Sequence, residues 1–152
     1  MSTATATAAP PRPVSSPATA LRRDPVAQAF LILRIGLVVF PIVMGLDKFA
    51  HVLTDDWARY LAPQFNDIIP GSAGTDMHLI GIVEIVAGLV VAVTPRYGAL
   101  LVAGWLAGII VNLLLVGGYG DVAFRDFGLL LGALTLSRLA AARTDLSSRG
   151  GA

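Results

Sequence analysis

Residues 26–46 read VAQAFLILRIGLVVFPIVMGL and contain a single charged residue, Arg34. A helix that crosses a membrane needs roughly 20 mostly apolar residues to cover ~30 Å of hydrocarbon. The stretch is too long for the apolar part of a signal peptide, and Asp47 and Lys48 follow it where a small-residue cleavage site would be needed. We therefore expect a retained membrane-spanning helix over residues 26–49.

Three further apolar runs follow the first. Residues 77–93 hold one charge and residues 98–116 hold none, whereas residues 122–142 hold three. The charged residues within these runs are Glu84, Arg125, Asp126 and Arg138. The pattern predicts an all-α membrane protein, built as a four transmembrane helix bundle over residues 26–49, 76–93, 97–116 and 122–142.

The composition agrees with a membrane location. The chain has 152 residues, of which 55% are hydrophobic and 14% charged, whereas soluble domains carry about 25% charged residues. A net charge of +1 leaves no general basic surface, so we expect no nucleic acid among the partners. The lack of cysteine excludes disulfides, thiol catalysis, cysteine-ligated iron–sulfur clusters and c-type haem attachment within this chain. A redox role would therefore need a bound cofactor or a partner protein.

The chain divides into one membrane domain and two tails. Residues 1–25 contain five prolines and few side chains that could pack, which predicts a disordered N-terminal tail. Residues 26–142 form the four-helix domain, and we expect residues 143–152 to be a flexible C-terminal tail.

Basic residues predict the orientation in the cell membrane. With four spans, both termini lie on one side, and the segments on that side hold seven basic residues against three on the other. The seven are Arg12, Arg22, Arg23, Arg96, Arg138, Arg143 and Arg149, and the three are Lys48, Arg59 and Arg125. Because cytoplasmic segments are enriched in Lys and Arg, we expect both termini in the cytoplasm.

The outward loop, residues 51–75, carries its own signals. Residues 54–56 (Thr-Asp-Asp) resemble a helix N-cap followed by acidic residues, and Thr75 is the expected cap of the second span. Two interpretations of the loop stay open. It lies on the outer leaflet as a short amphipathic segment, or it packs over the mouth of the bundle. The apolar residues in question are Trp57, Tyr60, Leu61, Phe65, Ile68 and Ile69.

Each span places its polar residue on a face of small residues. The expected faces are Arg34, Val38, Pro41, Gly45 and Lys48 in the first span; Gly81, Glu84 and Gly88 in the second; Gly104, Gly108 and Asn112 in the third; and Arg125, Gly128 and Gly132 in the fourth. Small residues allow membrane helices to approach closely, and polar side chains follow them into the interface. We therefore expect these faces to point into the bundle.

Depth along the helices predicts that most of these polar residues meet. At about 1.5 Å per residue, five of them belong to the outer half, whereas Arg34 lies deeper and either reaches toward Glu84 or extends to the inner interface. The candidate site residues are Arg34, Lys48, Glu84, Asn112, Arg125 and Asp126. Two interpretations stand side by side: a buried ion-pair network that orders the helices, or a polar pocket open outward for a headgroup, a quinone ring or a proton. His51 and His78 lie at helix ends, but their spacing does not suggest a metal site.

The layout resembles the DoxX-like family of small four-helix membrane proteins over about residues 30–140. The matching segments are residues 33–36 (LRIG), 44–49 (MGLDKF), 81–89 (GIVEIVAGL) and 125–128 (RDFG). Ala87 stands where the family commonly has the first glycine of a Gly-Gly pair. The resemblance implies functional roles for Arg34, Lys48 and Glu84. It also implies a place in a membrane oxidoreductase complex, such as quinone-linked sulfur oxidation or an assembly with superoxide dismutase and a sulfurtransferase.

We accordingly expect a non-catalytic integral membrane component that organises a redox or envelope-stress assembly. One alternative is a quinone-linked membrane oxidoreductase subunit, with quinone as its cofactor. A second is a carrier for a small molecule or a lipid headgroup. The expected partners are the lipid bilayer, a soluble or membrane redox protein, and a second copy of the chain.

Overall fold

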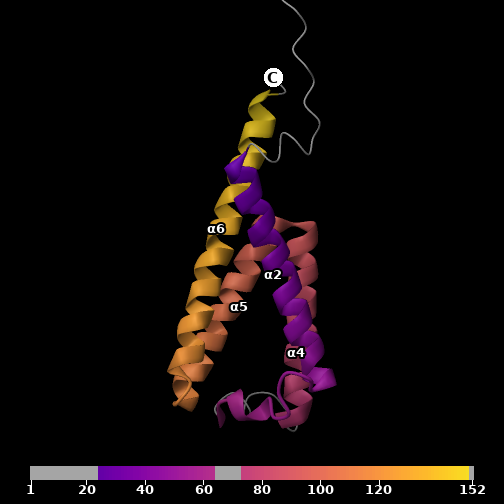
Figure 1. Ribbon diagram of the computed structural model, residues 1–152, viewed down its shortest axis with the longest axis vertical. Coiled ribbons are helices and arrows are strands. Elements are labelled where there is room, and N and C mark those ends of the chain that lie inside the picture. The colour runs from indigo at the N-terminus through magenta and orange to yellow at the C-terminus, as the bar shows by residue number, and fades with distance from the viewer. Residues whose placement is uncertain (1–23, 64–72, 151–152) are drawn as a thin grey trace, which may run out of the picture.

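The computed structural model describes residues 24–63 and 73–150, and within these ranges the chain is helical, with no strand. Four long helices run alternately up and down (Figure 1). They are α2 (Pro25–Ala50), α4 (Ala73–Val93), α5 (Pro95–Val116) and α6 (Gly120–Gly150), with a short 3-10 helix, η1 (Ala58–Tyr60), after α2. The beginning of α2 and the end of α6 lie at one end of the bundle, and the segment with η1 crosses the other end.

Three of these helices are long and apolar enough to cross a membrane: α2, residues Thr75–Val93 of α4, and α5. The fourth, α6, is long enough but less apolar, because Arg125, Asp126 and Arg138 interrupt its apolar surface. The protein is therefore an all-α chain with three candidate spans in its described part, and its composition indicates a membrane protein.

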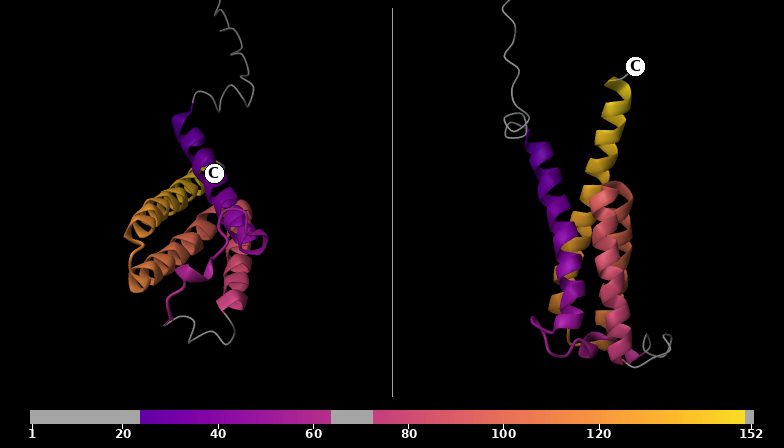
Figure 2. Two further views of the ribbon diagram at one scale, coloured as in Figure 1. Left: turned by 60° about the horizontal axis from the view of Figure 1, so that its bottom comes forward. Right: turned by 90° about the vertical axis from the view of Figure 1, so that its right-hand side faces the viewer.

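The helices associate as two closely packed pairs, α2 with α4 and α5 with α6, while α2 and α6 touch less (Figure 2). Glycines set the distance within the first pair. A Cβ placed on Gly45 would lie 2.5 Å from the carbonyl oxygen of Gly81, and one placed on Gly81 would lie 2.7 Å from that of Gly45. Gly88 makes a similar approach to Val38. These small residues lie in the helix interface, as in other membrane helix pairs.

Gly98 of α5 makes a similar approach to Val91 of α4, but the glycines predicted to lie in the interfaces of α5 and α6 do not play this role. Nothing lies within 4 Å of a Cβ placed on Gly104, Gly108 or Gly128, and one placed on Gly132 would meet only the side chain of Leu33 at ordinary contact distance. The prediction that these glycines lie in the helix interface is therefore wrong. In the apolar core the small residues of α5 and α6 are alanines instead, Ala99, Ala103, Ala133 and Ala140, so these helices are rotated relative to the expected faces.

The apolar core lies toward the α4–α5 turn, away from η1. It contains, among others, Phe30, Leu37, Val91, Ala99, Val102, Ala133 and Leu136. The turn itself is tight because Thr94 is followed by Pro95 at the first position of α5, where proline is favoured. The opposite end of the bundle is less filled, and the candidate site lies there.

Several predicted boundaries need correction. Residues 143–150 continue α6 instead of forming a flexible tail, because the run Leu139–Arg143 consists of strong helix formers and no proline follows it. Helix α4 begins at Ala73, so Thr75 lies within it and is not its cap. Residues 54–56 precede the single 3-10 turn η1, where Asp56 accepts a hydrogen bond from the Arg59 amide at 3.3 Å.

The N-terminal boundary falls at Asp24, whose carboxylate accepts hydrogen bonds from the amides of Val26 and Ala27 and so caps α2. The expected tail lies, except for its last two residues, outside the described residues. The same is true of Phe65, Ile68 and Ile69 in the outer loop.

Candidate functional site

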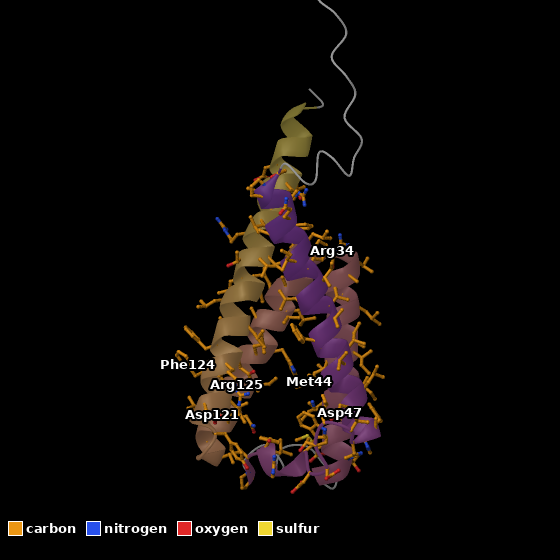
Figure 3. All side chains as sticks on the ribbon, in the orientation of Figure 1. Arg34, Met44, Asp47, Asp121, Phe124 and Arg125 are labelled. Carbon is orange, nitrogen blue, oxygen red and sulfur yellow. The ribbon has the colours of Figure 1, made fainter. Side chains whose placement is uncertain are left out.

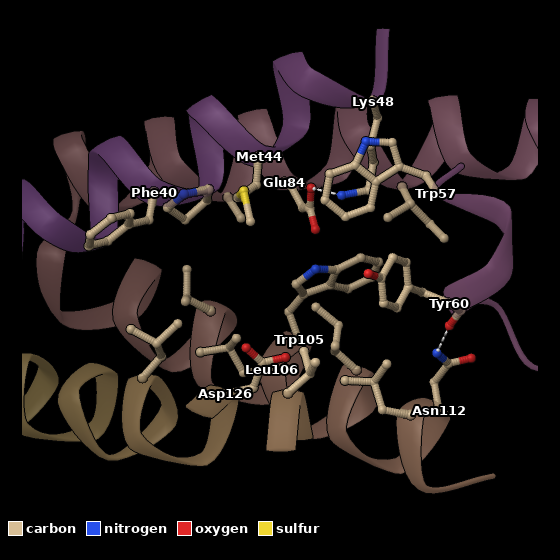
Figure 4. A pocket seen from close by; sticks show the side chains of 18 of the residues that line it. Phe40, Met44, Lys48, Trp57, Tyr60, Glu84, Trp105, Leu106, Asn112 and Asp126 are labelled. Atoms are coloured by element: carbon tan, nitrogen blue, oxygen red, sulfur yellow. Dashed lines mark hydrogen bonds and ion pairs between the residues drawn. The ribbon is translucent and has the colours of Figure 1, made fainter. Parts of the chain in front are cut away.

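A cavity of about 360 Å³ lies between the four helices at the end that η1 covers. Its wall is mostly apolar, and its polar groups gather toward the η1 end (Figures 3 and 4). Five of the six predicted site residues line it, and Arg34 does not. The polar and aromatic lining residues are Phe40, Lys48, Trp57, Tyr60, Glu84, Trp105, Asn112, Arg125 and Asp126.

Lys48 and Glu84 form a buried ion pair across the α2–α4 interface, with Nζ 2.6 Å from Oε2. Their side chains are only 5% and 9% exposed. The glycines explain the register, because each charged residue follows its contact glycine by three positions: Gly45 precedes Lys48, and Gly81 precedes Glu84. Residues three apart share a helix face, so the close glycine contact brings the two charges together.

The Lys48 ammonium also lies over the ring of Trp57, 4.2 Å from the ring centre. Asp47 holds Trp57 in this place, because its Oδ2 accepts a hydrogen bond from the indole Nε1 at 3.0 Å. The other carboxylate oxygen of Asp47 accepts hydrogen bonds from the backbone amides of Val52 and Leu53. Asp47 is therefore a structural residue of the site that the sequence analysis missed. Its place at the end of an apolar helix, ten residues before a tryptophan, is too weak a signal to reveal it.

Asn112 of α5 anchors the loop that closes the cavity. Its Oδ1 accepts a hydrogen bond from the Ala62 amide at 2.8 Å, and its Nδ2 donates one to the Tyr60 carbonyl. The Tyr60 ring packs against that of Tyr119, with centres 4.9 Å apart. Of the two interpretations of the outer loop, packing over the bundle mouth therefore describes residues 57–62, whose aromatic side chains Trp57 and Tyr60 face the cavity.

Arg125 and Asp126 do not join the Lys48–Glu84 pair. Arg125 pairs with Asp121 at 3.0 Å on the outer surface of α6, where the two side chains are 70% and 74% exposed. Asp126 is partly buried and faces the cavity, and it makes no hydrogen bond or ion pair with a described residue. Of the expected buried ion-pair network, the described residues form only the Lys48–Glu84 pair. Neighbouring helix residues point about 100° apart, so Asp126 faces the cavity while Arg125 lies at its edge, where it also reaches Asp121.

Arg34 lies outside the cavity. Its Nη2 donates a hydrogen bond to the carbonyl oxygen of Ala92 in the last turn of α4. Of the two expectations for Arg34, the approach to Glu84 is wrong, and the side chain reaches toward the end of α4 that lies away from η1. Arg34 is 14 positions before Lys48, or about 21 Å along the helix, which places it at the end of α4 that has unpaired carbonyl groups.

Trp105 of α5 is a further aromatic residue of the site, which was not among the predicted site residues. Its indole lies in the cavity with Nε1 directed toward Glu84 (Figure 4). That nitrogen is buried and has no hydrogen-bond partner of normal geometry among the described residues. The spacing in the sequence indicates this position, because Trp105, Ile109 and Asn112 follow one another at intervals of four and three and so share one helix face.

The two histidines have other surroundings. His51 ends α2 in a left-handed conformation with φ 53°, and His78 stacks on Phe49 with ring centres 4.8 Å apart. No group of three His, Asp or Glu side chains within the described ranges is placed to hold a metal ion. Asp76 is fully buried and has no hydrogen-bond partner there either.

Comparison of the chain with protein-family models, with characterised proteins and with solved structures finds no match. The resemblance to DoxX-like proteins therefore rests on the motifs of residues 33–36, 44–49, 81–89 and 125–128.

Proposed function

We propose that this chain is a four-span membrane protein that binds an amphipathic small molecule in the cavity between its helices. The observation that carries the proposal is the combination of an apolar cavity and a nearly dehydrated ion pair on its wall. Charged residues inside a membrane usually face a cavity or a bundle interior, and they often mark a ligand or proton site. Small-molecule pockets in general combine apolar walls with a few polar groups that orient the ligand.

We assign α6 as the fourth span because it packs closely against α5, which is apolar enough to cross the membrane. Its charged residues do not contradict this. Asp126 lines the cavity, and Arg125 is near the end of the bundle that η1 covers. The arginine distribution then favours an orientation with both termini in the cytoplasm and the η1 end of the cavity toward the outside of the cell membrane.

A purely structural ion pair is the competing explanation for Lys48 and Glu84. Such a pair would order two helices without any need for open space beside it. Here the pair borders a cavity of about 360 Å³, and the indole N–H of Trp105 is directed toward Glu84 at the wall of the same space. Because this buried N–H makes no hydrogen bond of normal geometry among the described residues, a ligand acceptor atom in the cavity would satisfy it.

The second candidate function is that of a quinone-linked subunit, as the DoxX-like resemblance implies. One observation favours it: the Trp105 indole and the Lys48 ammonium both offer N–H donors at the cavity, and a quinone carbonyl is an acceptor. In either case the chain binds without catalysing, and a redox or envelope-stress assembly would use it as its membrane component.

Mass spectrometry of the protein purified in mild detergent tests the proposal. We compare Leu129→Trp, which fills the cavity, with Leu131→Trp, which changes a lipid-facing residue two positions along the same helix. A bound small molecule should be present in the wild type and in Leu131→Trp, and absent from Leu129→Trp. If no small molecule is enriched over bulk lipid, but a stable protein partner copurifies with all three, the chain organises an assembly and the binding function is wrong.

A further inference from the structure

Four charged side chains line the cavity: the cations Lys48 and Arg125, and the carboxylates Glu84 and Asp126. Lys48 and Glu84 form a direct ion pair at 2.6 Å, and Arg125 pairs at 3.0 Å with Asp121, which does not line the cavity. Asp126 is therefore the charged lining residue that has no direct ion pair among the described residues.

An unpaired carboxylate beside an apolar cavity is unfavourable, because little water is available to solvate it. It is stabilised either by a proton or by a cation that enters the cavity. The charge of Glu84 acts on Asp126 across the same space, and that of Arg125 acts on it in the opposite sense. An anionic ligand would meet two carboxylates there, and the two cations of the lining, Lys48 and Arg125, are each already in an ion pair.

The aromatic lining favours the same kind of ligand. Tryptophan and tyrosine rings attract cations through the negative potential of their faces. One of these rings already does so, since the Lys48 ammonium lies 4.2 Å from the centre of the Trp57 ring. Tyr60, Trp105 and Phe40 supply further rings around the cavity (Figure 4).

We infer that the cavity binds an amphipathic organic cation, such as an ammonium with an apolar substituent, whose charge lies at Asp126 and whose apolar part lies against the aromatic and aliphatic wall. This inference rests on the proposed binding function and narrows its ligand class. A neutral quinone would satisfy the Trp105 N–H but would leave Asp126 without a counter-charge.

A proton and the cation compete for Asp126, so binding should weaken as the pH falls. The other titratable or charged groups that face this space are Lys48 from α2, Tyr60 from the covering loop, Glu84 from α4 and Arg125 from α6. The side chains that α5 contributes, including Trp105 and Asn112, do not titrate.

The test uses a matched pair of probes, phenyltrimethylammonium and its neutral carbon isostere tert-butylbenzene. The full-length protein is reconstituted in vesicles of phosphatidylcholine, which carry no net charge. Its two tryptophans, Trp57 and Trp105, both line the cavity, so their fluorescence reports on what enters it. We expect a saturable response to the cation with at least about tenfold higher affinity than to the isostere, or ~1.4 kcal/mol.

Variants of Asp126 test whether this residue causes the preference for the cation over the neutral isostere. Asp126→Asn should abolish the difference between the two probes, and Asp126→Glu should retain most of it. The matched control is Asp55→Asn, which makes the same charge change at an exposed position of the outer loop that does not line the cavity. It should bind as the wild type does, and circular dichroism in vesicles should show that all variants are folded.

The two proposals fail in different ways. If the isostere or a short-chain benzoquinone binds as tightly as the cation, or if Asp126→Asn leaves the preference for the cation unchanged, the ligand class is wrong and the binding function stands. If cation, isostere and benzoquinone all give no saturable response in the folded wild type, the binding function is wrong as well.

Discussion

Among the described residues, one ion pair lies in the α2–α4 interface and another on the exposed surface of α6. Both join a basic side chain to a carboxylate, but they differ in burial and in sequence separation. Lys48 and Glu84 are nearly inaccessible and 36 positions apart in the chain. Arg125 and Asp121 are mostly exposed and lie one helical turn apart. Burial raises both the attraction within a pair and the cost of leaving one member alone, whereas exposed pairs contribute little. The comparison shows that burial decides how much each ion pair contributes to the stability of this protein.

The largest effect should come from breaking the buried pair on one side. Glu84→Gln leaves the Lys48 ammonium without its partner, and such a loss costs about 3–5 kcal/mol in soluble proteins. Unfolding in mixed micelles with increasing denaturing detergent measures the change. The double variant with Lys48→Met should recover much of the lost stability, because no unpaired charge remains. If Glu84→Gln is as stable as the wild type, the buried pair does not hold α2 and α4 together.

The second-largest loss of stability should come from disturbing the glycine contact next to the Lys48–Glu84 pair. Gly45→Ala places a Cβ against the Gly81 carbonyl, and overpacking of this kind costs about 1–3 kcal/mol. The variant should also separate Lys48 from Glu84. Gly108→Ala is the matched control, because nothing lies within 4 Å of its added Cβ. Equal stability of the two variants in the same unfolding assay would contradict the close approach of α2 and α4.

Removing the side chain of Asn112, which anchors the covering loop, should cause a smaller loss of stability. Asn112→Ala removes the acceptor of the Ala62 amide and the donor to the Tyr60 carbonyl, at a cost of roughly 1–2 kcal/mol. Hydrogen exchange measures it locally: the Ala62 amide should exchange faster, while amides in the middle of α5 stay protected. Unchanged exchange at Ala62 would show that the loop is held by its aromatic contacts alone.

The smallest effect should come from the exposed pair. Asp121→Asn removes a partner of Arg125 that is 74% exposed, and such pairs contribute less than about 1 kcal/mol. The loss should shrink further as salt is added, because salt screens exposed charges. A loss as large as that of Glu84→Gln would mean that Arg125 takes part in the structure of the cavity.

The neighbours of Glu84 follow from the sequence more directly than those of Arg34 or Trp105 do. The positions of Lys48 and Glu84 follow from glycine spacing and depth, since both glycines lie in the α2–α4 interface. The same rule misjudged α5, where Gly104 and Gly108 are not at an interface and Trp105 faces the cavity. Small residues permit close packing but do not require it, so the rule holds only where a partner helix takes the space.

By itself, the sequence determined that the chain is helical and suited to a membrane, because hydropathy and helix periodicity are local properties of each segment. It also determined that polar residues from different helices belong to one depth, because the rise per residue is constant. Only the tertiary structure decided the rotation of α5 and α6, the contact of Arg34 with Ala92, and the pairing of Arg125 with Asp121 instead of a residue of the cavity. In a membrane both the lipid-facing and the buried side of a helix are apolar, so hydropathy alone cannot choose between them and the packing of neighbouring helices must.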